Sequence, residues 1–347
     1  MKSRFNLRPF IKINEENKIP LIGHIAFGII DRGTNLIQVR PSTHCPLSCI
    51  FCSTDAGPCS RRRMAEYVVE PGWLVSWFNQ LAEYKGVWDI EAHIDTVGDP
   101  LVYRHLPSLI RQLHMNPRVK VISIQTHGAL LSEKIIDCLE EAGLSRINLS
   151  IDSLDPNLAK YLSGTPWYDI EKVKQLAEYI VQCTKIDLLL APVWVPSIND
   201  KDIPEIIEFA LNIGAGKHWP PLGIQKYIPH KFGRKPRRVR PLSWRRFYKA
   251  LRTWERKYGI KLVLRPEDFN IYKVKPLPPV FKINEKVVAE IVGRGWMKGE
   301  WIARAKNRTI TIVDVPFSNP PIGRKIRVKI IQNKHNIYLA RLYPKPW

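Results

Sequence analysis

The feature that most constrains the fold is a regular alternation of short apolar runs with helix-like stretches between residues 36 and 257. Runs typical of strands lie at 36–40, 90–96, 119–126, 146–152, 185–194 and 223–228. Stretches with helical periodicity lie between and after them, at 73–84, 106–114, 132–141, 170–182, 203–211 and 243–257. Alternation at this spacing predicts a parallel sheet with crossover helices, and such sheets bind ligands at the carboxyl ends of their strands.

The pattern changes after the Leu277-Pro278-Pro279 segment. Five short β-rich runs follow, at 287–292, 301–305, 309–313, 326–331 and 337–342, and polar turns separate them. Even spacing of short strands predicts a small closed antiparallel barrel. We therefore expect an N-terminal extension over residues 1–34, a main α/β domain over 35–275 with a basic loop and helix region at 231–260, and a barrel over 276–347.

Three cysteines stand close together where the first predicted strand of the main domain ends. Cys45, Cys49 and Cys52 have the spacing C-x3-C-x2-C, with Phe51 directly before the third. A structural zinc site needs four protein ligands, whereas an iron–sulfur cluster held by three cysteines leaves one iron open to a small molecule. Three ordinary cysteines in a turn, or a zinc loop completed by His44, are the alternatives.

This cysteine spacing, with an aromatic residue at position 51, resembles the signature of the radical S-adenosylmethionine (radical SAM) superfamily. The resemblance covers about residues 35–230 and implies a partial (β/α)6 barrel, here with a C-terminal small antiparallel β-barrel. It also implies two cofactors: a [4Fe-4S] cluster on the three cysteines, and S-adenosylmethionine (SAM) on the open iron. Reductive cleavage of SAM in this family gives a 5′-deoxyadenosyl radical, so the chain is expected to be an enzyme.

Four further stretches resemble the SAM-binding motifs of this family, in the expected order. Gly-Asp-Pro at 98–100 resembles the Gly-Glu-Pro motif, with Asp in place of Glu, and Thr-His-Gly at 126–128 resembles a Thr-Asn-Gly turn. Ser-Ile-Asp-Ser at 150–153 and Ala-Pro-Val at 191–193 resemble the segments that meet the SAM carboxylate or ribose and the adenine. The SAM-binding residues that the resemblance implies are Gly98, Asp99, Pro100, Thr126, Ser150, Asp152 and Val193.

Cys59 lies seven residues beyond Cys52, in a loop expected to stay near the cluster. Radical methylases of RNA bases use additional cysteines to carry or release the methyl group, so Cys59 is a candidate catalytic residue; a bystander thiol is the alternative. No second cysteine triplet accompanies the first, and methylthiolation is therefore not expected.

Charge is divided unevenly along the chain. Residues 1–216 carry 22 Lys and Arg against 25 Asp and Glu, whereas residues 217–347 carry 32 against 7, so the net charge of +22 comes entirely from the last third. A basic region joined to a near-neutral one is typical of polyanion binders, and nucleic acid is the first expectation.

The basic residues fall in two groups. Residues 231–247 hold eight Lys and Arg with no acid and with interleaved aromatic residues, a composition that suits phosphates and unpaired bases. The C-terminal barrel resembles the TRAM domain, a compact RNA-binding barrel. The candidate RNA-binding residues are Lys231, Arg234, Lys235, Arg237, Arg238, Arg240, Arg245, Arg246, Arg304, Arg324 and Arg327.

The sequence thus predicts a cytoplasmic radical SAM enzyme that modifies a base carbon of a structured RNA, tRNA first and rRNA second, with methylation as the first reaction considered. Its expected partners are the RNA and an electron donor of ferredoxin or flavodoxin type, and no membrane span is expected. A radical SAM enzyme acting on a protein, peptide or lipid, and a non-catalytic iron–sulfur RNA-binding protein, are the alternatives.

Overall fold

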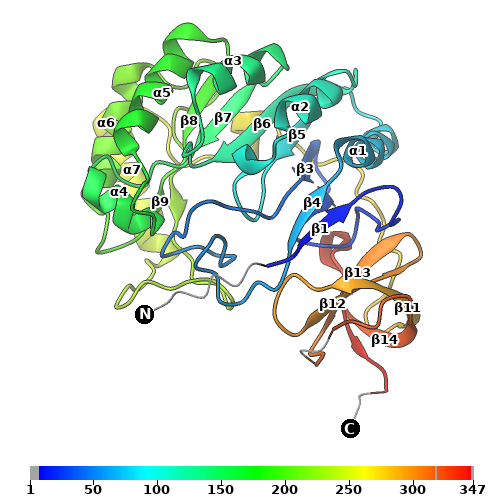
Figure 1. Ribbon diagram of the computed structural model, residues 1–347. Helices are drawn as coiled ribbons and strands as arrows, with labels where there is room; N and C mark the ends of the chain where they lie inside the picture. The colour runs from blue at the N-terminus through cyan, green and yellow to red at the C-terminus, as the bar shows by residue number, and fades with distance from the viewer. Residues whose placement is uncertain (1–7, 317–318, 345–347) are drawn as a thin grey trace.

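The computed structural model describes residues 8–316 and 319–344 of the 347-residue chain. Residues 1–7, 317–318 and 345–347, which belong to the predicted extension and barrel, lie outside the described residues. The described chain forms an α/β sheet layer and, beside it, a small β-barrel built from the C-terminal residues (Figure 1).

A six-stranded sheet carries the main domain, in the order β2-β3-β5-β6-β7-β8. Its strands are β2 (Gly28–Asp31), β3 (Leu36–Arg40), β5 (Ile90–Ile94), β6 (Val119–Thr126), β7 (Arg146–Leu149) and β8 (Asp187–Leu190). The strands from β3 to β8 are parallel, and β2 pairs antiparallel with β3. A bridge between Leu190 and Leu222 and the parallel pair β9 (Val193–Trp194) and β10 (Gln225–Lys226) extend the layer beyond β8. All carboxyl ends of the parallel strands therefore meet at one edge.

Helices connect the strands and cover the outer face of the sheet (Figure 1). They are α1 (Pro71–Lys85), α2 (Leu106–His114), α3 (Glu133–Glu141), α4 (Pro156–Ser163), α5 (Ile170–Cys183), α6 (Asp202–Ile213) and α7 (Trp244–Tyr258), with short 3-10 turns at Pro100–Val102, Pro266–Phe269 and Lys334–Asn336. Side chains of Ser132, Asp155 and Asp169 accept hydrogen bonds from backbone N–H groups in the first turns of α3, α4 and α5. Such caps satisfy donors that a helix leaves unpaired, which fixes where these helices begin. None of the helices in the described ranges is long and apolar enough to cross a membrane.

The C-terminal residues form a closed barrel in the order β11-β12-β13-β15-β14. Its strands are β11 (Lys286–Arg294), β12 (Glu300–Ala305), β13 (Arg308–Val313), β14 (Lys325–Gln332) and β15 (Leu339–Leu342). The pairs β11–β12, β12–β13, β14–β15 and β11–β14 are antiparallel. A short parallel pairing of β13 with β15 closes the barrel. Its interior is a separate apolar cluster that includes Ile291, Ile312 and Tyr338.

The N-terminal segment joins the two parts. β1 (Phe10–Ile13) pairs in parallel with β4 (Glu66–Val69), and both lie next to the barrel (Figure 1). The backbone of Ile22 accepts a hydrogen bond from Thr309 N at 2.9 Å, and Gly23 O accepts one from Tyr338 N at 2.9 Å. Gly23 has φ +135°, and a Cβ on it would stand 2.0 Å from Thr309 O, so only glycine allows this close approach.

The structure has the predicted α/β partial barrel and the predicted C-terminal small β-barrel, in which the β13–β15 pairing is parallel and the other pairings are antiparallel. Each predicted strand and helix has a counterpart in the structure, although the strands predicted at 146–152, 185–194 and 223–228 are shorter or divided. The sequence analysis missed α4, β1 and β4. The helix α4 is short, and β1 and β4 pair across more than fifty residues of sequence, so neither has a strong local signal.

Candidate active site

A cavity of about 790 Å3 lies at the carboxyl edge of the sheet. This volume is within the range of about 300–1,000 Å3 that ligand pockets have. The strand ends contribute Arg40, His93, Asp95, Gln125, His127, Ser150 and Val193. The cysteine loop contributes Cys45, Leu47, Cys49, Phe51, Cys52 and Thr54. The remaining wall includes Lys226, Tyr227, His230, Arg234 and, from the C-terminal barrel, Trp296.

The cysteine loop follows β3 and is fixed by the end of α4. Ser48 N donates to Ser163 O at 3.0 Å, and Ile50 N donates to Leu162 O at 2.9 Å. Gly164 approaches so closely that a Cβ on it would stand 2.3 Å from Ser48 O. The helix that the sequence analysis missed therefore supports the loop that carries the three cysteines.

The three thiols suit a cluster with three protein ligands. Burial raises the pKa of the Cys45 and Cys49 thiols well above their usual range, so both thiols are protonated without iron. They bind iron as thiolates, and binding therefore releases their protons. Cys52 Sγ accepts a hydrogen bond from Ala56 N at 3.2 Å and lies 3.5 Å from Thr54 Oγ1. Within the described residues no three His, Cys, Asp or Glu side chains converge as ligands of a single metal ion. A cluster needs no such convergence, because each cysteine binds a different iron.

The seven predicted SAM-binding residues divide into two sets. Gly98, Ser150 and Val193 line the cavity with the cysteines. The other four, Asp99, Pro100, Thr126 and Asp152, are not among the lining residues.

Asp99 joins two strand ends. Its carboxylate accepts hydrogen bonds from Thr126 Oγ1 at 2.9 Å and from His127 N at 3.1 Å. Its backbone N donates to His44 O at 2.9 Å, beside the first cysteine. Asp99 thus holds the end of β5 against the end of β6 and against the cysteine loop.

Asp152 has a comparable role on the other side. Its Oδ1 accepts a hydrogen bond from Val193 N at 2.8 Å, and its backbone oxygen accepts one from Asn199 Nδ2 at 2.8 Å. Burial raises its pKa. His127 Nδ1 lies 3.9 Å from Asp152 Oδ2, and His127 Nε2 lies 3.9 Å from Cys49 Sγ. His127 therefore stands between the cysteine loop and the end of β7, at the position where the sequence motif has Asn.

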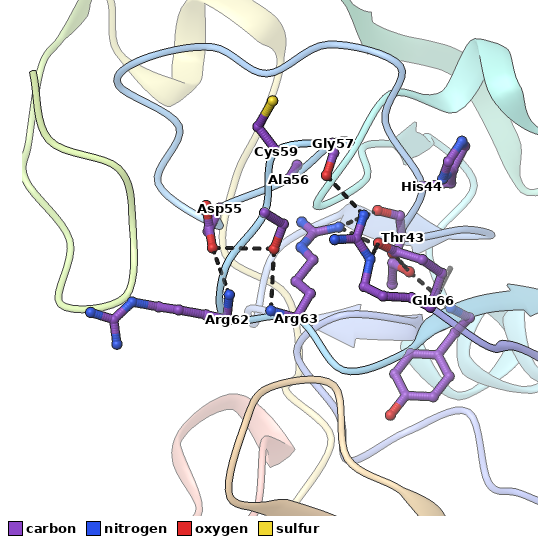
Figure 2. Close-up of polar contacts among 12 residues, drawn as sticks. Thr43, His44, Asp55, Ala56, Gly57, Cys59, Arg62, Arg63 and Glu66 are labelled. Carbon is purple, nitrogen blue, oxygen red and sulfur yellow. Dashed lines mark hydrogen bonds and ion pairs between the residues drawn. The ribbon is translucent and has the colours of Figure 1, made fainter. Parts of the chain in front are cut away.

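Arg63 is a buried residue in a run of three arginines at 61–63. Its Nη1 donates to Thr43 O at 2.5 Å and pairs with Glu66 Oε2 at 3.2 Å. Its Nη2 donates to Thr54 Oγ1 at 3.0 Å and to Val97 O. Figure 2 shows Arg63 near Thr43 and Glu66, below the loop that carries Ala56 and Gly57. Arg63 thereby connects the cysteine loop to the end of β5.

Arg234 also binds the cysteine loop. Its Nε donates to Cys49 O at 2.7 Å, its Nη1 pairs with Asp55 Oδ1 at 2.9 Å, and its backbone N donates to Cys52 O at 2.8 Å. The sequence analysis predicted Arg234 as an RNA contact. In the structure its guanidinium is engaged by the loop, at the base of the basic segment.

Most of the other basic candidates are exposed. The exposed candidates are Lys231, Lys235, Arg237, Arg238, Arg240, Arg245, Arg246, Arg324 and Arg327. Arg304 differs from them, because its guanidinium pairs with Glu290 at 3.0 Å and donates to Asn17 O and Lys18 O at 3.2 Å. It fastens the barrel to the N-terminal segment.

An aromatic pair lies beside the cavity. Trp244 and Tyr248, at the start of α7, are 53% and 38% exposed, and their rings stack with centroids 5.7 Å apart and planes at 21°. Lys226, which lines the cavity, places its Nζ 4.8 Å from the centre of the Trp244 ring. The exposed pair is thus adjacent to a wall of the cavity.

Cys59 lies outside the cavity. It is exposed, and its backbone N donates to Ser48 Oγ at 3.2 Å. Figure 2 shows its sulfur directed away from the network of Asp55, Arg63 and Glu66.

Residues 39–210 match the model of the Radical SAM superfamily. The chain belongs to the radical SAM superfamily. The cofactors of this radical SAM enzyme are accordingly a [4Fe-4S] cluster and SAM, as the resemblance implied.

Several proteins are similar to this radical SAM chain. An uncharacterized protein of Methanocaldococcus jannaschii is 40% identical over 99% of the chain and 82% of its own length. A GTP 3′,8-cyclase of Chlorobaculum tepidum is 28% identical over 56% of the chain and 55% of its own length. The crystal structure of SuiB from Streptococcus suis bound to S-adenosylmethionine covers 69% of the chain and 50% of its own, with a TM-score of 0.51 and 17% identity, which shows a shared fold. The chain spans about half the length of the GTP 3′,8-cyclases it matches.

Proposed function

We propose that this radical SAM enzyme modifies a base carbon of a structured RNA, tRNA first and rRNA second. Cys45, Cys49 and Cys52 hold the cluster, and Gly98, Ser150 and Val193 contact SAM. When bound and reduced, the cofactors supply a 5′-deoxyadenosyl radical that abstracts hydrogen from an unactivated C–H bond. The chain's own groups orient the cofactors, position the base and exclude water.

One observation carries the proposal for RNA: an exposed aromatic pair adjoins the cavity, and the exposed Arg245 and Arg246 lie between its two members in sequence. Lys226 connects the cavity wall to Trp244. Stacking on aromatic rings and neutralisation of phosphates are the two ways in which proteins hold unpaired nucleotides. The target base enters the cavity, and a neighbouring base stacks on Trp244 and Tyr248. A base inside a helical stem has to leave its stack to enter.

Three proposals complete this function. Residues 35–275 form the catalytic domain, residues 276–347 hold the RNA in the manner of a TRAM barrel, and residues 1–34 join them.

Methylation is the first reaction considered, and Cys59 takes part in it only if its loop brings the exposed thiol into the cavity. A ferredoxin or flavodoxin type of protein supplies the electron that reduces the cluster.

The similarity to GTP 3′,8-cyclases favours a second candidate, a free purine nucleotide as substrate. Lys226, His230 and Arg234 line the cavity and offer positive or hydrogen-bonding groups to phosphates. The match to the superfamily model ends at residue 210, before the basic C-terminal third, and a free nucleotide does not require that third.

The deciding experiment compares the nucleosides of purified tRNA and rRNA, by mass spectrometry, from cells with and without this gene. One nucleoside missing from the deletion strain supports the proposal and names the product. The reconstituted, reduced protein is then given SAM with either the RNA from the deletion strain or GTP. Product from GTP alone, together with an unchanged nucleoside profile, rejects the RNA proposal in favour of the nucleotide.

A further inference from the structure

Four polar residues on three adjacent strands lie side by side next to the cavity. Glu91 and His93 are two residues apart on β5, so their side chains share one face of the sheet. Ser123, on β6, is the Cα partner of His93, and Arg146, on β7, is the Cα partner of Ser123. His93 is the member of this group that lines the cavity.

Hydrogen bonds fix where the protons of this group are. Arg146 Nη2 pairs with Glu91 Oε1 at 2.5 Å, so the Glu91 side chain is present as a carboxylate. A carboxylate only accepts hydrogen bonds, and the Ser123 hydroxyl donates its one proton to the same oxygen at 2.5 Å. Ser123 Oγ therefore accepts from His93 Nδ1, which lies 2.7 Å away. The proton of the neutral His93 ring is thus on Nδ1, and Nε2 carries a lone pair.

The lone pair of His93 Nε2 is available to a molecule in the cavity. Burial lowers the pKa of His93, and the charges of Arg146 and Arg40 act in the same direction while Asp95 and Glu91 oppose them. The ring is therefore neutral near pH 7. Within the part of the chain that the structure describes, the one hydrogen bond of this ring is made by Nδ1. The side chain is 15% exposed, and Nε2 is accessible to solvent. The cavity thus contains a hydrogen-bond acceptor of fixed orientation.

The position of His93 separates it from the residues that are proposed to contact SAM. Gly98, Ser150 and Val193 lie beyond the ends of β5, β7 and β8, whereas His93 lies within β5. The acceptor is therefore set back from the edge of the sheet, behind the cofactor position and in the same cavity. Enzymes that take a base into a pocket read it by hydrogen bonds to its Watson–Crick edge.

We propose that His93 contacts the substrate, and that its Nε2 accepts a hydrogen bond from an N–H group on the Watson–Crick edge of the base being modified. The identity of the donor as a nucleobase rests on the proposed function. Ser123, Glu91 and Arg146 are positioning residues, because together they hold the His93 tautomer that accepts. Substrate recognition then extends from the exposed aromatic pair to the face of the sheet inside the cavity.

The first test measures turnover by the full-length, reconstituted protein and three variants. His93→Phe removes the acceptor and keeps a ring, and His93→Gln keeps an acceptor oxygen. His114→Gln is the matched control, because His114 is exposed and does not line the cavity. The measurements are iron per chain, the Kd for SAM, and kcat/KM with RNA from the deletion strain.

His93→Phe is expected to lower kcat/KM about tenfold, the effect of one lost hydrogen bond, and to keep its iron content and its Kd for SAM within about twofold of the wild type. His93→Gln is expected to lose less turnover than His93→Phe, because its side-chain oxygen can still accept. His114→Gln is expected to match the wild type in all three measurements.

The second test reads the tautomer directly and needs no substrate. In the reconstituted protein labelled with nitrogen-15 histidine, NMR distinguishes protonated from unprotonated ring nitrogens, and the signals that His93→Gln lacks belong to His93. Near pH 7 we expect a protonated Nδ1 and an unprotonated Nε2. Ser123→Ala removes the group that accepts from Nδ1, so it is expected to raise the share of the tautomer with the proton on Nε2.

A proton on Nε2 of the wild type overturns the proposal whatever the substrate is. Wild-type turnover in His93→Phe overturns the contact, and so does a loss of SAM binding as large as the loss of turnover, which assigns Nε2 to the cofactor. If the wild-type protein acts on GTP and not on RNA, the proposed function fails, and the same variants with GTP decide the contact. If it acts on neither, the proposed function and the contact fail together.

Discussion

Arg63 and Arg234 both bind the cysteine loop, and both come from stretches whose composition suggests surface charge. Arg63 is 3% exposed although it stands in a run of three arginines. A run of like charges in a sequence does not indicate which member turns inward. That choice depends on partners brought by folding, here Thr43, Glu66 and Val97.

Replacing Arg63 with Met is expected to lower the free energy of unfolding by about 3–5 kcal/mol, because it leaves part of the charge of buried Glu66 without its partner. Arg8 still pairs with Glu66 at 3.0 Å, which favours the lower end of that range. Urea unfolding of the cluster-free chain measures the change. Arg61→Met, at an exposed neighbouring position, is the control and is expected to cost less than about 0.5 kcal/mol. Equal losses in the two variants contradict this role of Arg63.

His24 is expected to make stability depend on pH. Burial, together with the charge of Arg40, lowers the pKa of His24 to about 3. Its neighbours include the Phe27 and Tyr67 rings, and its Nδ1 accepts a hydrogen bond from Ala26 N at 3.1 Å. Burial raises the pKa of Tyr67, and a phenol is in any case neutral at acidic pH, so Tyr67 does not titrate in the range where His24 does.

The unfolded chain gains a proton on His24 below about pH 6.5, and the native chain does not gain it until about pH 3. The free energy of unfolding therefore falls as the pH falls through this window, and His24 contributes up to about 1.4 kcal/mol of that loss per pH unit. Denaturant titrations between pH 7 and 5 are expected to show a shallower decline in His24→Asn, whose amide oxygen keeps an acceptor for Ala26 N. The exposed His114→Asn is expected to keep the wild-type slope, and a wild-type slope in His24→Asn rejects the prediction.

At the scale of elements, the strands and helices that build the sheet were predictable, because each carries its own periodicity. The position of Gly98 at the end of β5 was predictable for the same reason. The supports of the cysteine loop were not. They come from α4, from the segment at 233–234 and from the turn between β11 and β12, which lie up to 250 residues away in sequence.

Gly98→Ala is expected to disable cofactor binding, because a Cβ at this position would stand 1.9 Å from His44 O, beside Cys45. The backbone of residue 98 or of His44 would have to shift, at the point where the turn after β5 meets the cysteine loop. We expect at least a tenfold weaker binding of SAM and less iron per chain, measured by equilibrium binding and iron analysis. Gly72→Ala is the matched control: nothing lies within 4 Å of a Cβ there, and the first turn of α1 favours alanine over glycine. Normal SAM binding by Gly98→Ala contradicts the close packing described for this turn.

At the scale of the whole molecule, the charge division along the sequence corresponds to two parts of one structure. The near-neutral first two thirds build most of the cavity, and the basic last third supplies the exposed segment at 231–246 and the barrel. Composition predicted this division. It did not predict that two of the basic candidates, Arg234 and Arg304, are used to hold the protein together.

RNA binding is expected to weaken steeply with salt, because phosphate contacts release counterions. The triple variant Lys235→Ala, Arg237→Ala, Arg238→Ala is expected to reduce the slope of log affinity against log salt by about 2, at about 0.7 per lost contact with single-stranded RNA. Filter binding between about 50 and 200 mM salt gives the slope. A triple alanine variant at the exposed Lys120, Lys134 and Lys185 is the control and is expected to keep the wild-type slope. Indistinguishable slopes for the two triple variants count against the 231–246 segment as the RNA surface.

The backbone contacts of Ile22 and Gly23 with Thr309 and Tyr338 also set an order of assembly during synthesis. A ribosome makes the first thirty residues long before it makes the barrel, and N-terminal parts of a chain generally fold first. Here the early segment has to wait for its partners until residue 338 has left the ribosome. The same delay applies to Trp296, so the cavity acquires the wall that this residue contributes only after the ribosome has made the turn between β11 and β12. A chain made only as far as residue 295 therefore lacks one wall of the cavity that the three cysteines line, whereas the folded structure has that wall.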